Sequence, residues 1–439
     1  MNGVVLGTGA GAYLRLLRHG PAAKPFIAAV IARLPISMAP LGMILLIQHE
    51  RGAYTIAGVV TGAYALGSAV GSPVWGRTMD RRGQPGVVVA TSLVCAALLA
   101  GLAVAAVKGG GDALLIVLAA LAGLSFPPVS PAMRASWRVI FPDAASRRVG
   151  FALDATSVEA IFVGGPLLLS LLLALTTPLV PLLVTAGLMD LGGLAYARTS
   201  AARRWQPSAE PSAEPSTGRR RRRAGPSVFA AGGVGAVLLV VLAMSVAFGQ
   251  LDTSMAATAG VLLGGTQRVG ILFASIAGGS AIGGLVFGSR HWVHDEGRAV
   301  TVLLGLFGVF LALMSLLMLR SHPSLWIVLP LLFVTGLTIA PTLIMQQNLL
   351  DHLSPPARRN EAQSLLSAAN TTGAAAGTAA AGLLIDLQGT AASFGGAAAA
   401  AVIASVIALT SRRRWRAASA AVAAEPESES AGTATQPVP

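Results

Sequence analysis

The sequence predicts an all-α membrane protein in which twelve transmembrane helices form two pseudo-symmetric six-helix bundles. Three observations predict this fold class. First, 54% of the 439 residues are hydrophobic and only 11% are charged, whereas soluble domains carry about 25% charged residues. Second, long apolar runs recur along the chain. Third, patterns of the first half return in the second half. The composition excludes an ordinary soluble enzyme.

Each predicted span is a mostly apolar run bounded by charge, glycine or proline. A helix needs about 20 such residues to cross a hydrocarbon core of roughly 30 Å. Twelve runs meet this requirement. In order they are Pro25–Ile47, Thr55–Trp75, Pro85–Val107, Ala113–Met133, Val149–Leu173, Pro178–Tyr196, Val228–Phe248, Arg268–Phe287, Val300–Leu319, Leu325–Gln346, Ala362–Ile385 and Ala392–Thr410.

The basic residues predict the orientation of these spans. Most of the 31 Lys and Arg residues fall in alternate loops, on the side of the N-terminus. Short loops that keep positive charge remain in the cytoplasm. We therefore expect a multi-pass protein of the plasma or inner membrane with both termini cytoplasmic.

Composition divides the chain into five parts. We expect a cytoplasmic tail (1–24), an N-terminal bundle (25–196), a linker (197–226), a C-terminal bundle (227–411) and a disordered cytoplasmic tail (412–439). The linker is rich in Pro, Ser and Glu, which cannot bury enough apolar surface to fold. It ends in five arginines, 219–223. Beside a span, such a run favours contact with anionic lipid headgroups over nucleic-acid binding.

The two halves share sequence patterns. The run Gly67-Ser68-Ala69-Val70-Gly71 returns as Gly279-Ser280-Ala281-Ile282-Gly283, an offset of 212 residues. The prolines of span 4 (Pro127, Pro128 and Pro131) have a counterpart in span 10, Pro341. Proline frees a backbone carbonyl and bends a helix, so we expect paired kinks. Two six-span units in one orientation predict two parallel bundles related by an axis normal to the membrane.

The loop between spans 2 and 3 carries a specific motif. Residues 76–84 read GRTMDRRGQ, which resembles the Gly-x-x-x-Asp-Arg-x-Gly-basic motif of the major facilitator superfamily, with Gln84 in place of the usual basic residue. Gly165-Pro166 in span 5 is similar to part of the antiporter motif of that family. The resemblance implies a secondary transporter, similar to bacterial drug/proton antiporters, that works by alternating access. It further implies that spans 2 and 11, and spans 5 and 8, meet across the bundle boundary.

The motif predicts a cytoplasmic gate. Its residues are Gly76, Asp80, Arg81 and Gly83 in the loop, together with Arg358 and Arg359 before span 11. We expect Asp80 to bind the positive N-terminal end of span 11 and one of these arginines when the cavity faces out. A topogenic charge cluster without a gating role is the alternative.

Three charged residues lie inside predicted spans of the first half. They are Arg33, Asp154 and Glu159. A buried charge in a bilayer is costly unless it is paired or faces water, so we expect a pair of Arg33 with Asp154 or with Glu159. The two acids lie five residues apart and point about 140° away from each other on a helix. We expect Glu159 to be the proton carrier. A permanent salt bridge, or an Arg33 that snorkels to the headgroups, is the alternative.

Polar residues of spans 7 and 10 are candidates for the substrate cavity, because the resemblance implies that these spans line it. They are Gln250, Thr338, Thr342 and Gln346. Asp252 and Asp386 fall near outer span ends, where we expect them to be solvated. The glycine pairs 67/71, 279/283 and 373/377 predict close helix contacts, either at the sliding bundle boundary or in static packing.

The sequence shows no catalytic triad, no nucleotide-binding loop and no cluster of metal ligands. We therefore expect no enzyme activity and no cofactor or metal. The first choice of function is proton-coupled efflux of a small molecule by a monomer that contacts protons and membrane lipids but no nucleic acid. The alternatives are a gradient-driven importer or facilitator of a metabolite, and a non-transporting receptor or scaffold.

Overall fold

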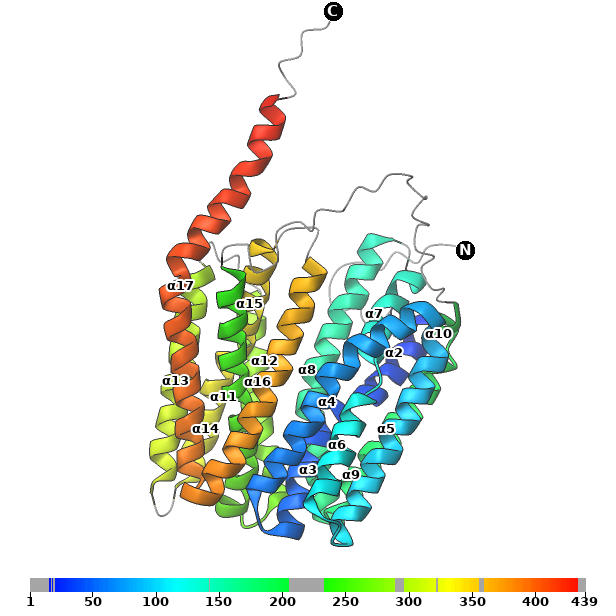
Figure 1. The fold of residues 1–439 in the computed structure, drawn as a ribbon, viewed down its shortest axis with the longest axis vertical. Helices are drawn as coiled ribbons and strands as arrows, with labels where there is room; N and C mark the ends of the chain where they lie inside the picture. The colour runs from blue at the N-terminus through cyan, green and yellow to red at the C-terminus, as the bar shows by residue number, and fades with distance from the viewer. Residues whose placement is uncertain are drawn as a thin grey trace, which may run out of the picture.

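The computed structural model describes residues 16, 18, 20–141, 143–204, 233–288, 296–320, 323–354 and 359–432, and these contain helices but no strand. Together the helices form the twelve spans that the sequence predicts (Figure 1). The first half contains α2 (Gly20–Arg33), α3 (Pro35–Arg51), α4 (Tyr54–Arg82), α5 (Gln84–Val107), α6 (Asp112–Leu124), α7 (Val129–Ile140), α8 (Ala144–Leu175), α9 (Leu179–Ala197) and α10 (Ser200–Arg204). The second half contains α11 (Val234–Leu262), η2 (Thr266–Arg268), α12 (Val269–Gly288), α13 (Glu296–Met318), α14 (Leu325–Leu337), α15 (Ile339–Leu353), α16 (Arg359–Gln388) and α17 (Thr390–Gly432).

Three spans consist of two helices each, because proline lacks the N–H that continues the hydrogen-bond ladder. The expected kinks separate α6 from α7 at residues 125–128, and α14 from α15 at Thr338, three residues before Pro341. A third break, which we did not predict from the sequence, lies between α2 and α3 at Leu34, the residue before Pro35. This break places Arg33 at the last position of α2, deep inside span 1.

The internal repeat is visible in helix packing. A methyl group at Gly67 or Gly71 of α4 would collide with the backbone of α6, and one at Gly279 or Gly283 of α12 would collide with the backbone of α14. The two halves therefore contain the same close helix contact. Gly373 and Gly377 of α16 lie against the backbone of α11 in the same way. Each of the three glycine pairs thus packs against a helix of its own bundle. The hypothesis that they form the sliding boundary between the bundles is therefore wrong for this conformation.

Eleven helical segments are long and apolar enough to cross a membrane. The twelfth span, α16, is 30 residues long but is rich in Ser, Asn and Thr in its first half. It lies between the two bundles, against α4 on one side and α11 on the other (Figure 1). A helix in this place contacts protein more than lipid, so it tolerates a more polar surface.

Among the described residues, the two bundles meet at one end only. We call the end where α4 begins and α16 finishes the distal end, and the opposite end the terminal end. At the distal end, Gly58 and Gly62 of α4 lie against the backbone of α16, and Gly270 of α12 lies against Pro166 and Ser170 of α8. These are the helix pairs 2/11 and 5/8 that the resemblance implies. Figure 1 shows α4 and α16 side by side at the distal end and apart at the terminal end.

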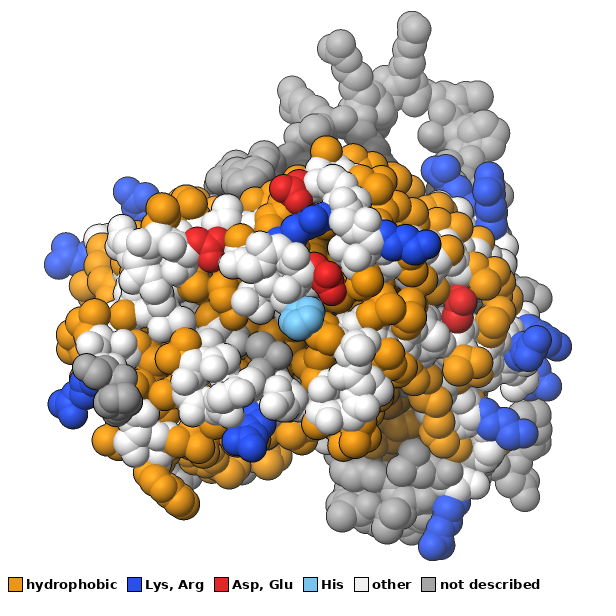
Figure 2. Space-filling view, turned by 90° about the horizontal axis from the view of Figure 1, so that it is seen from below, with side chains coloured by type: hydrophobic (Ala, Val, Ile, Leu, Met, Phe, Trp, Pro, Cys, Tyr) orange, Lys and Arg blue, Asp and Glu red, His pale blue; other side chains and the backbone are white. Residues whose placement is uncertain are grey.

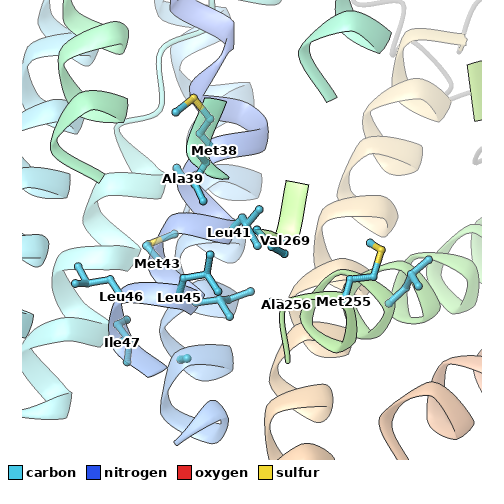
Figure 3. Close-up of a cluster of buried hydrophobic side chains, with 14 of the residues drawn as sticks. Met38, Ala39, Leu41, Met43, Leu45, Leu46, Ile47, Met255, Ala256 and Val269 are labelled. Atoms are coloured by element: carbon cyan, nitrogen blue, oxygen red, sulfur yellow. The ribbon is translucent and has the colours of Figure 1, made fainter. Parts of the chain in front are cut away.

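The buried core shows the same asymmetry. One cluster joins the bundles in the distal half, where Leu41 of α3 lies beside Val269 of α12 (Figure 3). Met255 and Ala256 of α11 belong to the same cluster. In the terminal half each bundle has a core of its own, around Trp137 in the first and around Trp415 in the second. The hydrophobic seal between the bundles is therefore distal.

In the terminal half the facing sides of the two bundles are exposed, and we call the space between them the cleft. The face of α16 that contacts α4 at Ala375 and Gly382 is exposed two and three turns earlier, at Ala368 and Ser364, since residues 7 and 11 apart share a helix face. On α4, Ser72 and Asp80 are exposed in the same half. The cleft therefore opens toward the terminal end.

The chain ends differ in part from the expectation. Residues 200–204 of the expected linker form α10, whose Ala201 and Ala202 are buried. α17 continues past 411, the expected end of the bundle, to Gly432. Its Trp415 is 2% exposed and donates a hydrogen bond of 3.0 Å from Nε1 to the Gly233 carbonyl, which anchors the extension. The remainder of the linker (205–226) and the first six residues of the expected C-terminal bundle (227–232) lie outside the described residues, as do most of the N-terminal tail and the last seven residues.

Candidate functional site

The charge at the break in span 1 forms a buried ion pair. Nη2 of Arg33 lies 2.8 Å from Oδ1 of Asp154 in α8, and the two side chains are 1% and 5% exposed. Nε of Arg33 donates to the Ala29 carbonyl at 3.0 Å. The structure therefore pairs Arg33 with Asp154, not with Glu159, and the burial of Arg33 excludes snorkelling to the headgroups in this conformation.

Glu159 is exposed, and it lies on the face of α8 that meets the other bundle. Pro166 lies seven residues later on that face, and its carbonyl is close to Gly270 of α12. Two turns toward the terminal end the bundles have separated, and among the described residues Glu159 is exposed there. Its carboxylate therefore faces the boundary between the bundles, at the cleft.

Asp252 of α11 is the functional candidate that the sequence reading misplaced. It is exposed, whereas Leu251 and the seven residues from 253 to 259 are all buried. Ala256 and Ala259 share its helix face and belong to the core cluster that includes α3 of the other bundle. The cover provided by α3 thus ends at Asp252, which faces the bundle boundary instead of bulk solvent at a span end. A single acid in an apolar span gives no sign of its direction, so only the burial of its neighbours identifies it.

The four residues expected to line the cavity are instead buried inside the C-terminal bundle. Thr338 and Thr342 hydroxyls donate to backbone carbonyls of their own span, at 2.8 and 2.6 Å. Nε2 of Gln346 lies 3.1 Å from the Met244 sulfur, and Gln250 lies next to Gly396 of α17. Threonine satisfies its hydroxyl on the preceding turn, so a polar residue in a span does not identify a cavity wall. The exposed polar side chains of the terminal half of α16 include Ser367, Asn370 and Thr372.

Most of the motif was expected in a loop but lies in the last turns of α4, which continues through Asp80 and Arg81 to Arg82. Gly83 has a φ of 88°, which favours glycine, and it turns the chain between α4 and α5. Asp80 and Arg81 are exposed at the terminal end, and Gly76 borders open space. Arg358 lies outside the described residues and the side chain of Arg359 is not described. The expected latch between Asp80 and these arginines therefore stays a prediction.

The surroundings of Gln84 explain why this residue replaces the basic residue of the motif. It is the first residue of α5, it is fully buried, and its Oε1 accepts a hydrogen bond of 3.0 Å from the Tyr196 hydroxyl. Ser136 bonds the same hydroxyl at 2.8 Å. A basic side chain here would bury an unpaired charge, which is strongly unfavourable, so the neutral amide suits this network.

A comparison with family models decides the family. The chain matches the model of the Major Facilitator Superfamily over residues 25–319 and 270–437. It belongs to this superfamily. The chain is therefore a multi-pass membrane transporter of small molecules by secondary transport, and not an enzyme. Within the described residues, no three His, Cys, Asp or Glu side chains gather as a metal site would require.

Solved structures share the fold. A peptide transporter of the POT family (a point mutant) aligns with a TM-score of 0.67 at 16% identity, over 90% of this chain and 94% of its own. The nucleoside transporter NupG, also a mutant, aligns at 0.64 and 10%, over 90% and 99%. A bacterial homologue of the human lysosomal transporter Spinster, inward-facing and occupied, aligns at 0.64 and 12%, over 94% and 98%. No curated protein matches the sequence.

Proposed function

We propose that this member of the major facilitator superfamily is a proton-coupled efflux antiporter of a bacterial plasma membrane. The observation that carries the proposal is the pair of exposed carboxylates at the bundle boundary, Glu159 in one bundle and Asp252 in the other. Arg33 is neutralised by Asp154. Glu159 and Asp252 therefore remain as groups that a proton and a cargo molecule can occupy in turn.

The distribution of basic residues supports efflux from the cytoplasm. Among the described residues, the distal end carries only Arg51, Lys108, Arg268 and Arg320, and the other loop arginines and Lys24 lie at the terminal end (Figure 2 shows the distal face). By the positive-inside rule the terminal end is cytoplasmic. The cleft is then open to the cytoplasm, ready to receive cargo there, and closed to the outside.

The proposed cycle uses the two acids in opposite states. A protonated carboxylic acid in a low-dielectric cleft is neutral, and it ionises when cargo displaces the proton. The buried Arg33–Asp154 pair holds the end of α2 against α8 through the cycle. We further propose that the bundles comprise residues 25–196 and 227–411, that one chain acts as a monomer, and that Asp80 with Arg358 or Arg359 closes the cytoplasmic end.

Proton movement in everted vesicles tests this function. A pH-sensitive dye follows the lumen while cationic, neutral and anionic amphipathic compounds are added to wild type, Glu159→Gln and Asp252→Asn. Glu50→Gln is the matched control, because Glu50 is an exposed acid at the distal end. We expect at least one compound to release protons through wild type and the control, with a loss of about tenfold or more in one acid variant.

The alternatives give different results. If labelled solutes equilibrate through wild type without proton movement, and both acid variants transport normally, the protein is a facilitator and the antiport proposal is wrong. If a compound moves with protons in the same direction, the protein is an importer.

A further inference from the structure

Asp386 connects the two bundles at the distal end. It lies in the last turn of α16, yet its carboxylate accepts hydrogen bonds from the first backbone N–H groups of α4. The Tyr54 N–H donates to Oδ1 at 2.9 Å, and the Thr55 N–H donates to Oδ2 at 2.6 Å. Asp386 therefore caps a helix of the other bundle.

The cap is favourable for α4 and unfavourable for α16. α4 begins after Ala53, which has no side chain able to accept a hydrogen bond, so its first N–H groups need an external acceptor. An acid in the last turn of α16 lies at the negative end of its own helix dipole. The position of Asp386 is thus explained by the start of α4 and not by its own helix. The backbones approach closely enough because residue 382, one turn earlier, is glycine, where a methyl group would collide with the Tyr54 carbonyl.

The second helix pair at the boundary contains the corresponding bond. The N–H of Gly270, in the first turn of α12, donates to Oγ of Ser170 in α8 at 2.6 Å, and this bond is buried. The internal repeat relates α8 to α16 and α4 to α12, so both bonds run from the distal half of one helix to the start of its partner in the other bundle. The bonds of the charged Asp386 lie at the surface, and the bond of the neutral Ser170 lies in the interior.

We propose that Asp386 and Ser170 form a distal gate, in which each side chain caps the first turn of a helix in the opposite bundle and so holds the distal end closed. The two bonds, here called the distal caps, exist only while α4 meets α16 and α8 meets α12. They must break when the distal end opens. The proposal rests on alternating access as part of the proposed function, but it concerns closure and not the coupling ion or the cargo.

A cysteine at the buried boundary reports opening without transport. Met255 is 1% exposed and lies in the core cluster between the bundles (Figure 3), so Met255→Cys is protected while the distal end is closed. The natural cysteine, Cys95, is fully buried and serves as a check on folding. A membrane-impermeant maleimide is added to right-side-out vesicles that carry Met255→Cys, and the labelling rate at position 255 is measured.

We expect Asp386→Ala to raise the labelling rate about fivefold or more, because loss of both hydrogen bonds shifts the population toward the open state. Asp386→Asn, which keeps the shape and one acceptor, and Ser170→Ala should each raise it less, and the combination of Asp386→Ala with Ser170→Ala should raise it most. Asp112→Asn is the matched control. Asp112 is also a distal carboxylate, but its partner Arg51, at 3.6 Å, belongs to the same bundle.

The proposal is overturned if labelling at position 255 stays at the wild-type rate in the Asp386 and Ser170 variants while Cys95 remains protected. It is equally overturned if Asp112→Asn raises labelling as much as Asp386→Asn does. Because these readouts need neither cargo nor a proton gradient, failure of the antiport proposal leaves them unchanged, and failure of the gate leaves the vesicle assay unchanged.

Discussion

At the scale of single residues, the buried pair of Arg33 and Asp154 shows how the fold accommodates charge in the membrane. Nε of Arg33 donates a hydrogen bond to the Ala29 carbonyl of its own helix, and Nη2 of the same side chain forms an ion pair with Asp154. Taking two charges out of water is costly, and their attraction offsets that cost only while both are present. Removal of one partner is therefore worse than removal of both.

We predict that Arg33→Met or Asp154→Leu alone lowers the free energy of unfolding by about 3–5 kcal/mol, and that the double variant recovers most of the loss. Thermal unfolding in detergent, arranged as a double-mutant cycle, measures the difference. Arg51→Gln is the control, since the Arg51–Asp112 pair is partly exposed and should contribute about 0–1 kcal/mol. Additive losses in the double variant would contradict the prediction.

At the scale of helices, close backbone contact is supplied by glycine at equivalent places in the two halves. Gly67 of α4 and Gly279 of α12 each face the backbone of a partner in their own bundle. In lipid no hydrophobic force draws helices together, so small residues that allow close packing hold each bundle. The boundary between bundles uses other glycines, including Gly58 and Gly62.

We predict that Gly67→Ala and Gly279→Ala each destabilise the protein by about 1–3 kcal/mol, because the added methyl group meets backbone that cannot move aside. Gly76→Ala, further along α4, meets nothing within 4 Å and should be neutral or slightly stabilising. Melting temperatures of the three variants check this. Equal melting temperatures for all three would show that the helices of a bundle slide freely past each other.

At the scale of the whole molecule, the helix pair α4 and α16 has one acidic residue at the distal end and one at the terminal end. Asp386, in the last turn of α16, caps α4 at the distal end, and Asp80, in the last turn of α4, lies at the terminal end, where α16 begins. In alternating access the two ends of the cleft are not open at the same time. Each acid therefore stabilises one of two opposite states.

We predict that Asp80→Asn acts opposite to Asp386→Ala, and lowers the labelling rate of Met255→Cys, because it removes a contact of the state that is open at the distal end. The expected decrease is about two- to fivefold. The same vesicles and maleimide measure it. Arg77→Gln, which changes a charge one turn before Asp80, is the control. A rise in labelling with Asp80→Asn would show that Asp80 has no role in terminal closure.

The sequence by itself determined the class of the protein. Apolar runs, loop charges and the internal repeat predict twelve spans in two bundles, and the Gly76–Gln84 motif indicates the superfamily. Apolar helices of sufficient length are required of a helical chain that crosses a bilayer, and the loop charges, the repeat and the motif can be read directly from the sequence. The kinks at Pro127 and Pro341 follow from covalent structure in the same way.

Only the tertiary structure decided which side chains meet. The sequence left Arg33 with two possible acids, and the packing of α2 and α3 on α8 selected Asp154. Thr338 and Gln346 proved to be buried, while Asp252 proved to face the bundle boundary. Asp386 bonds residues more than 330 positions earlier in the chain. The direction of a side chain in a span depends on which neighbouring helix covers it, and that is a property of the packed bundles and not of any local pattern.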